Sequence, residues 1–146
     1  MDHILVIKHG ALGDVIQATD AFASLRLSFP DAKISLLTSP AFGHLLSMSG
    51  WFDEIITDER KPVWNIRQSL HIRSVFKRDF DAIIDLQCSR RTARYFKVLQ
   101  PKGRWFGTVK GCSDPMPDFT DVNNRDRMLA ASKLLGPIFL RVILIG

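Results

Sequence analysis

Cysteine is scarce in this chain of 146 residues, and its placement excludes the usual sites built from cysteine. The two cysteines, Cys88 and Cys112, lie 24 residues apart, with no Cys-x-x-Cys pair and no histidine cluster beside them. Zinc sites and disulfide frameworks both need closely grouped or repeatedly paired cysteines. We therefore expect two reduced, partly buried thiols and no metal ion.

Long apolar runs and basic leaders are also missing at the start of the sequence. The apolar stretch within residues 1–8 is too short for a signal peptide or a membrane span, which predicts a cytoplasmic protein. The polar excess of a disordered chain is absent too, since 46% of the residues are hydrophobic and 24% are charged. A chain of this length fits one folded domain.

Acidic residues are nearly absent from the middle of the sequence. Between Arg60 and Lys110 there are thirteen Lys or Arg and only three Asp, whereas the rest of the chain holds seven basic and twelve acidic residues. A region this basic attracts nucleic acid, an anionic membrane surface or a phosphorylated small molecule, and charge alone does not choose among them. A solvated helix face is an equally good explanation.

Predicted strands alternate with predicted helices along the chain. Runs rich in β-branched and aliphatic residues predict strands at 4–8, 34–38, 54–57, 82–86 and 104–108. The first and fourth are nearly all apolar, so we expect them at the centre of a sheet. Helical periodicity and capping residues predict helices at 14–29, 41–48, 63–78, 89–99 and from 123 or 124 to 135. In the third helix, the side chains expected to face the core are Val63, Ile66, Leu70 and Val75.

This alternation predicts an α/β fold: a single Rossmann-like, three-layer domain with a mostly parallel central sheet, spanning 1–137. Residues 110–122, with two prolines and several aspartates, are expected to form a loop. The apolar residues 138–146 are typical of a strand that continues into further structure, and we interpret them as the start of a missing interdomain segment. Because an exposed strand of this kind aggregates, we expect it to pack on the domain, on a second copy as a homodimer, or on something absent.

The sharpest local motif follows the first strand and reads Lys8-His9-Gly10-Ala11-Leu12-Gly13-Asp14. Ligands of open α/β sheets bind beyond the carboxyl ends of the strands, and Gly10 and Gly13 allow close backbone approach there. The chain lacks the Gly-x-Gly-x-x-Gly order, the acidic residue after the second strand and the Gly-Lys-Ser/Thr of a P-loop, which excludes NAD binding and ATP hydrolysis. Asp14 either caps the following helix or takes a proton from an attacking hydroxyl, and its position alone favours the cap.

Several segments together resemble one enzyme family. Ile4-Leu5-Val6-Ile7-Lys8, followed by Gly10-Ala11-Leu12-Gly13-Asp14-Val15-Ile16, resembles the start of the heptosyltransferases, glycosyltransferase family nine, which add heptose to the lipopolysaccharide core. Later segments resemble the same family in the same order: 80–87, 104–107, 124–129 and 134–136. The resemblance covers residues 4 to about 137.

The resemblance implies an architecture and a reaction. Members of the family have two Rossmann-like domains facing a cleft, and this chain resembles the N-terminal, acceptor-binding half of such a GT-B glycosyltransferase. The implied reaction is an inverting, metal-independent transfer of heptose from an ADP-sugar donor to a hydroxyl of the phosphorylated inner-core lipopolysaccharide acceptor, with no cofactor. The family's proposed general base matches Asp14, which moves our interpretation of this residue from capping to catalysis.

The resemblance also gives the basic middle of the chain a partner, because the family's acceptor carries phosphates and acidic sugars. The acceptor-binding candidates are basic residues that follow the third strand or open the helix after the fourth: Arg60, Lys61, Arg90, Arg91 and Arg94. Loop and strand-end residues complete the set: His9, Gly10, Gly13 and Gln87. For His9 an exposed, unengaged side chain is the simpler interpretation, and for Gln87 a backbone hydrogen bond is an equal one. The basic residues left to a solvated helix face are Arg67, Arg73, Lys77 and Arg78.

The family's donor-binding parts, among them a lysine and an acidic residue of the second domain, have no counterpart in this sequence. We therefore expect the chain to be inactive alone. The alternative is a non-catalytic module of the same fold that binds an anionic saccharide or a protein partner. Nucleic acid is disfavoured as a partner because no recognised motif accompanies the charge. We expect the protein in the cytoplasm, with peripheral contact to the anionic inner face of the cytoplasmic membrane.

Overall fold

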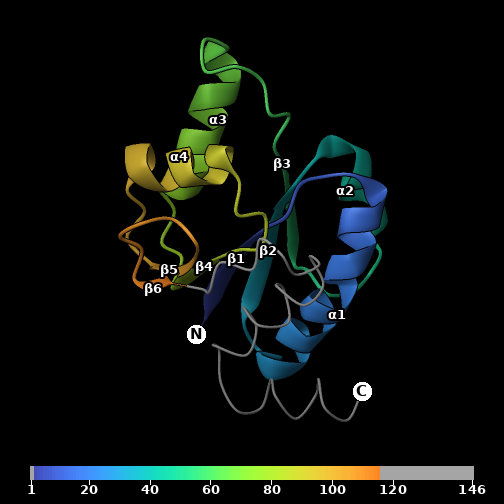
Figure 1. Ribbon diagram of the computed structural model, residues 1–146. Helices are drawn as coiled ribbons and strands as arrows, with labels where there is room; N and C mark the ends of the chain where they lie inside the picture. The colour runs from blue at the N-terminus through green and yellow to red at the C-terminus, as the bar shows by residue number, and fades with distance from the viewer. Residues whose placement is uncertain (1, 116–146) are drawn as a thin grey trace.

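Within residues 2–115, six parallel strands form the central sheet, in the order β3-β2-β1-β4-β5-β6 (Figure 1). They are β1 (His3–Ile7), β2 (Lys33–Thr38), β3 (Glu54–Thr57), β4 (Ala82–Asp85), β5 (Arg104–Gly107) and β6 (Asp114–Pro115). The computed structural model describes residues 2–115. The predicted fifth helix, the domain end at 137 and the tail 138–146, with its expected contact between copies, lie outside the described residues.

All five predicted strands are confirmed to within one residue at each end. The expected central strands are also confirmed, because β1 pairs with β2 on one side and with β4 on the other. The prediction of a loop from 110 onward was wrong at β6, where Asp114 pairs with Phe106 of β5. An ion pair supports this short strand, since Arg104 Nη2 lies 2.6 Å from Asp114 Oδ1.

In the described part of the chain, four helices cross over between the strands: α1 (Leu12–Ser28), α2 (Pro40–Ser47), α3 (Ile66–Phe76) and α4 (Arg90–Leu99). Proline at the first position of α2 suits a helix start because it has no N–H to leave unpaired. Asn65 caps α3 by accepting from the Gln68 amide, so this helix begins three residues later than predicted. Ser89 caps α4, as the sequence predicted, and it does so in a reciprocal capping box with Thr92.

The two faces of the sheet carry separate cores, which gives the three expected layers. Ile4 and Val6 of β1 pack with α1 and α2, while Leu5 and Ile7 point to the other face, toward α3 and α4. This alternation follows from the two-residue repeat of a strand. Every residue from Ile4 to Ile7 is fully buried, as the apolar run predicted for a strand covered on both sides.

Two predictions for residues 63–78 were wrong. Val63, Ile66 and Leu70 are largely exposed, and the buried positions of α3 are Gln68, Ile72, Val75 and Phe76. The predicted stripe started from Val63, but Val63 precedes the helix, and the loop before α3 and its first turn reach beyond the sheet (Figure 1). Arg78, expected on a solvated face, is half-buried and forms an ion pair in which its Nη1 lies 2.6 Å from Glu54 Oε1.

No helix among residues 2–115 is both long enough and apolar enough to cross a bilayer.

Candidate functional site

The order of strands creates a crevice between β1 and β4. From β1 the chain moves outward through β2 and β3, whereas from β4 it moves the opposite way through β5 and β6. The loops that follow β1 and β4 therefore diverge over opposite faces, which opens the sheet's carboxyl edge to a ligand. These loops contact each other, since the His9 backbone N–H donates to Gln87 Oε1 at 3.2 Å. Gln87 thus makes the backbone hydrogen bond that the sequence left open.

A hollow of about 470 Å³ lies at this edge. It brings together the loops that follow β1, β3 and β4, and its lining residues are His9, Glu59, Arg60, Gln87, Ser89 and Arg91. Four of these, His9, Arg60, Gln87 and Arg91, belong to the acceptor-binding set expected from the sequence. The topology therefore gathers candidates from three distant segments into one concave surface.

Asp58, which the sequence analysis missed, joins these loops from beneath. It follows β3, is fully buried, and its Oδ1 accepts from the Arg60 amide at 2.9 Å and from Gln68 Nε2 at 3.0 Å. Its Oδ2 accepts from Tyr95 Oη at 2.5 Å. One carboxylate thereby connects the loop after β3 to both α3 and α4. The available signal was its place, the first residue after a strand at the ligand-binding edge.

The pKa of Asp58 shows that this carboxylate is ionised. Burial acts to raise the pKa, but His9, the Tyr95 hydroxyl and the Arg60 amide outweigh burial and lower it to about 2. Tyr95 responds in the opposite sense, since burial and the neighbouring carboxylate raise the pKa of its hydroxyl. Tyr95 therefore remains a hydrogen-bond donor to Asp58 at every physiological pH.

His9 is buried, and the prediction of an exposed side chain was wrong. Its relative exposure is 1%, and its Nε2 lies 3.0 Å from Asp58 Oδ2. This close approach of His9 lowers the pKa of the Asp58 carboxyl. The physical reason for the burial is that the loops after β3 and β4 close over the end of β1, which local sequence does not reveal.

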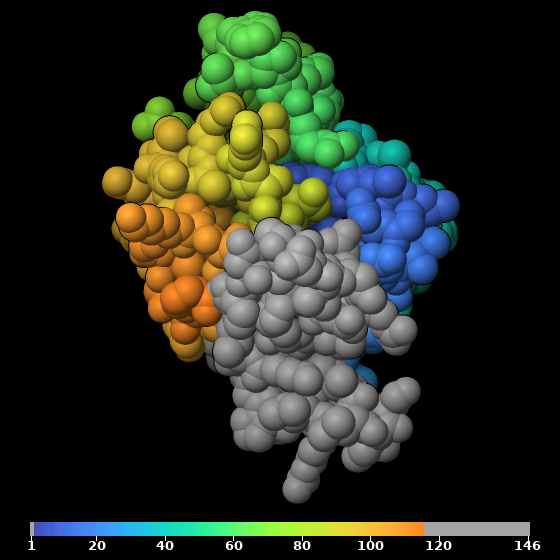
Figure 2. Space-filling view, viewed as in Figure 1, coloured from blue at the N-terminus to red at the C-terminus, as the bar shows by residue number. Residues whose placement is uncertain are grey.

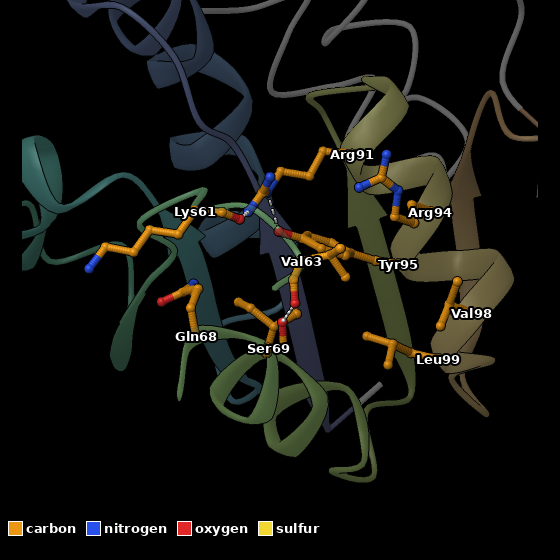
Figure 3. A pocket seen from close by; sticks show the side chains of 10 residues that line it. Lys61, Val63, Gln68, Ser69, Arg91, Arg94, Tyr95, Val98 and Leu99 are labelled. Carbon is orange, nitrogen blue, oxygen red and sulfur yellow. Dashed lines mark hydrogen bonds between the residues drawn. The ribbon is translucent and has the colours of Figure 1, made fainter. Parts of the chain in front are cut away.

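Arg91 is half-buried and ties α4 to the loop after β3. Its Nε donates to Tyr95 Oη at 2.7 Å and its Nη2 to the Lys61 carbonyl at 2.6 Å, contacts that Figure 3 draws as dashed lines. Its Nε also lies 3.8 Å from Asp58 Oδ2. Arg91 is thus held at the rim of the hollow by groups around it, which reduces the entropy lost when its guanidinium binds an anion.

Lys61, Arg90 and Arg94 take different positions from Arg91. Lys61 Nζ pairs with Glu59 Oε2 at 2.7 Å, and Figure 3 shows its side chain directed away from Arg91 and Arg94. Lys61 and Arg94 line a smaller, mostly apolar groove of about 100 Å³ between α3 and α4, which Arg91 shares with them. Arg90 is exposed at the first position of α4 and is not among the residues that line the hollow or this groove.

Asp14 lies in the first turn of α1, at the helix's positive end. It does not occupy the N-cap position, which is held by Ala11 without a side-chain hydrogen bond. Its half-buried carboxylate packs against Gly10, where an added methyl group would come within 3.0 Å of Asp14 Oδ2. Gly10 has a φ of +117°, which other residues rarely adopt, whereas the position of a side chain at Gly13 is open. Asp14 is not among the residues lining the hollow.

Asp85 is a second buried carboxyl that the sequence analysis did not single out. It ends β4, and its Oδ1 accepts from the amides of Gln87 at 3.1 Å and Cys88 at 2.8 Å. Burial raises the pKa of Asp85 despite these hydrogen bonds. Asp85 holds the loop after β4 in the shape that presents Gln87 to His9.

Among residues 2–115 there is no group of three or more His, Cys, Asp or Glu arranged to bind a metal ion.

Comparison with known proteins found no matching family model. A putative glycosyltransferase of Haemophilus influenzae is 38% identical over 61 residues, which is 42% of this chain but 18% of that protein.

Solved structures match much more of the chain. The glycosyltransferase family 9 protein of Veillonella parvula superposes with a TM-score of 0.76 at 21% identity, over 93% of this chain and 42% of its own. E. coli heptosyltransferase WaaC with ADP gives 0.70 at 18% identity, over 92% and 47% of the two chains. E. coli ADP-heptose lps heptosyltransferase II gives 0.68 at 19% identity, over 90% and 40%. The chain spans less than half of these structures, and over that span it has the α/β fold of family 9 glycosyltransferases and heptosyltransferases.

Proposed function

We propose that this chain supplies the acceptor-binding side of an inverting, metal-independent glycosyl transfer, from an ADP-heptose donor to the phosphorylated inner core of lipopolysaccharide. The observation that carries the proposal is the hollow at the β1–β4 crevice, which has the fold position of a ligand site and a basic rim. The fold neighbours support it, since WaaC is a heptosyltransferase whose structures contain ADP or ADP-2-deoxy-2-fluoro heptose.

Arg60 and Arg91 are the residues we assign to the phosphates and carboxylates of the acceptor. Both line the hollow, and the planar guanidinium group binds two oxygens of an anion at once. Asp58 holds both of them, because it accepts from the Arg60 amide and lies beside Arg91 Nε. Its negative charge also lowers the repulsion between these cations when the site is empty.

We assign Asp14 as the general base. In the proposed step its carboxylate takes the proton of the acceptor hydroxyl while the hydroxyl oxygen bonds to the anomeric carbon of heptose. The bond from that carbon to the ADP oxygen breaks, and ADP leaves with the electron pair from the opposite side, which inverts the configuration. A positioned base typically contributes about 10²–10⁴ in rate. The position of Asp14 beyond the end of β1 supports this role.

The donor side of the reaction belongs, in this proposal, to residues outside the described part of the chain or to another polypeptide. The WaaC structure with the donor analogue is about twice the length that this chain covers, since the match takes in 48% of it. We therefore propose that the 146-residue chain binds acceptor without transferring sugar. The acceptor is met at the inner face of the cytoplasmic membrane, and no cofactor takes part.

A calorimetric titration tests the binding proposal. The chain is titrated with a phosphorylated inner-core saccharide, with the dephosphorylated saccharide and with duplex DNA at several salt concentrations. Binding that is selective for the phosphorylated saccharide supports the proposal. A response to DNA that is unselective and falls steeply with salt would show instead that the basic surface is a nucleic-acid site.

A non-catalytic saccharide-binding module is the second candidate, favoured by the absence of Asp14 from the lining of the hollow. The two candidates differ in turnover. The chain is combined with a donor-binding domain, and transfer is compared between the parent and Asp14→Asn. Loss of turnover with unchanged acceptor binding supports the base, whereas equal turnover removes Asp14 from the mechanism. Absence of any transfer with intact saccharide binding would favour the module.

A further inference from the structure

An exposed apolar tip lies at the N-terminal end of α3, and it is formed by the loop before the helix and by the first turns of the helix. We define the tip as Val63, Trp64, Ile66 and Leu70, whose relative exposures are 66%, 80%, 72% and 57%. Figure 2 shows this green segment projecting from the body of the molecule. Single exposed apolar side chains are ordinary, but here four lie within eight residues and one of them is a tryptophan. Together they form an apolar patch whose exposure to water is unfavourable.

Basic side chains flank the tip, and the first of them, Lys61, is paired with Glu59 at 2.7 Å. Neither α3 nor α4 contains an acidic residue, while Arg67 lies within the tip's own sequence. Val63 shares the groove between α3 and α4 with Lys61 and Arg94, and the exposed Val98 of α4 extends the apolar surface along it. Apolar side chains with Trp at the centre and Lys or Arg at the margin are the composition of segments that lie in an anionic membrane interface.

The tip is connected to the candidate site. The loop from Asp58 to Asn65 starts at the hollow and ends at the tip, and the Lys61 carbonyl accepts from Arg91 Nη2. At its other end the Val63 carbonyl accepts from Ser69 Oγ at 2.9 Å. One loop that leaves the carboxyl end of β3 therefore contributes to both the hollow and the tip.

A second copy of the chain is a poor occupant for this surface. A symmetric dimer through the tip would place the basic residues of α3 and α4, among them Arg67 and Arg94, against their own copies, and neither helix contains an acid to pair with them. A layer of anionic headgroups over hydrocarbon matches both the charge and the apolar side chains. We propose that the tip docks on an anionic lipid surface, with Trp64 at the level of the headgroups and Arg67 and Arg94 on the phosphates. This inference deepens the proposed encounter with a membrane-borne acceptor, and its test contains no acceptor, so either proposal can fail alone.

The test uses the full chain and two kinds of vesicle, phosphatidylcholine alone and phosphatidylcholine mixed with phosphatidylglycerol. Binding is measured by co-sedimentation, and tryptophan emission reports the insertion of Trp64. Trp105 is fully buried and Trp51 half-buried, so a blue shift on binding comes mainly from Trp64. Trp64→Phe is expected to abolish the shift while retaining most of the binding.

Three substitutions distinguish binding through the tip from binding through any exposed apolar residue. Trp64→Ser is expected to weaken binding to anionic vesicles roughly tenfold or more, because it removes a large apolar side chain from the interface. Leu27→Ser is the matched control, since Leu27 is 61% exposed on α1 in the opposite layer and is expected to bind like the parent. Arg67→Gln is expected to cost about fivefold, the worth of one basic residue at an anionic surface.

Several results would overturn the proposal. These are no preference for vesicles with phosphatidylglycerol, binding without a change in Trp64 emission, and equal losses in Trp64→Ser and Leu27→Ser. Self-association that is abolished by Trp64→Ser, measured by sedimentation velocity without lipid, would identify a second copy as the occupant instead. Circular dichroism of each variant confirms that a loss of binding is not a loss of folding.

Discussion

Replacing Asp58 by asparagine tests whether one buried carboxylate organises the loops at the carboxyl edge. Asparagine has nearly the same shape, but it has no charge and turns an N–H group toward partners that already donate: Arg60, Gln68 and Tyr95. The substitution therefore removes the attraction to His9 and leaves buried donors competing for one carbonyl oxygen.

The size of the effect follows from the pKa. Lowering the pKa of Asp58 from 3.8 to about 2 corresponds to about 2 kcal/mol in favour of the folded state when the carboxylate is ionised. Removing one partner from a buried charge cluster typically costs about 3–5 kcal/mol, so we expect Asp58→Asn to lower the free energy of unfolding by about 2–4 kcal/mol. Because the pKa is lowered on folding, this stability is complete above about pH 4 and is lost as the pH falls toward 2.

Urea unfolding of parent and variant, followed by circular dichroism at neutral and at acidic pH, measures both quantities. Glu59→Gln is the control, because Glu59 and Lys61 form an exposed pair that is expected to contribute about 0–1 kcal/mol. The reasoning is refuted if Asp58→Asn costs no more than Glu59→Gln, or if the difference between parent and Asp58→Asn fails to shrink at acidic pH.

Two further predictions concern the loops after β1 and β4. Gly10→Ala should destabilise the fold by about 1–3 kcal/mol, because Gly10 has a positive φ and packs against Asp14. Gly13→Ala should be neutral or stabilising by up to about 1 kcal/mol, because the position of a side chain at Gly13 is open. Thermal unfolding of the two variants measures the difference. Asp85 has a raised pKa, so its ionisation opposes folding as the pH rises above 3.8, and Asp85→Asn should gain stability relative to the parent between acidic and neutral pH. Urea unfolding of both proteins between acidic and neutral pH measures this difference. A stability of Asp85→Asn relative to the parent that stays constant or falls as the pH rises would contradict the prediction.

The order of elements and the layers of the fold were predictable because buried parallel strands are apolar on both faces. Ile4 to Ile7 and Ala82 to Ile84 show this pattern, and both lie at the centre of the sheet. Ser89 was likewise predictable as a cap, since capping depends on residues only three apart. Helix faces near an end were harder, because the exposure of Ile66 depends on where α3 projects beyond the sheet.

The candidate site was predictable in outline and not in its contacts. Basic residues after β3 and β4 meet at one edge because parallel strands end there together, and Arg60 and Arg91 both line the hollow at that edge. The contacts of Asp58 with Tyr95 and His9 span 37 and 49 positions, so local sequence predicts neither these contacts nor the burial of His9. A rule that inspects every charged residue directly after a predicted strand would have found Asp58.

Saccharide binding by matched arginine variants tests the central claim most directly. Arg60 lines the hollow and Arg67 lies in the apolar tip, so calorimetry with the phosphorylated inner-core saccharide compares Arg60→Gln with Arg67→Gln. We predict that Arg60→Gln weakens binding about tenfold or more, the worth of a charge-assisted hydrogen bond, while Arg67→Gln binds like the parent. Equal affinities in the two variants, or no binding of the saccharide by the parent, would contradict the assignment of the hollow as the acceptor site.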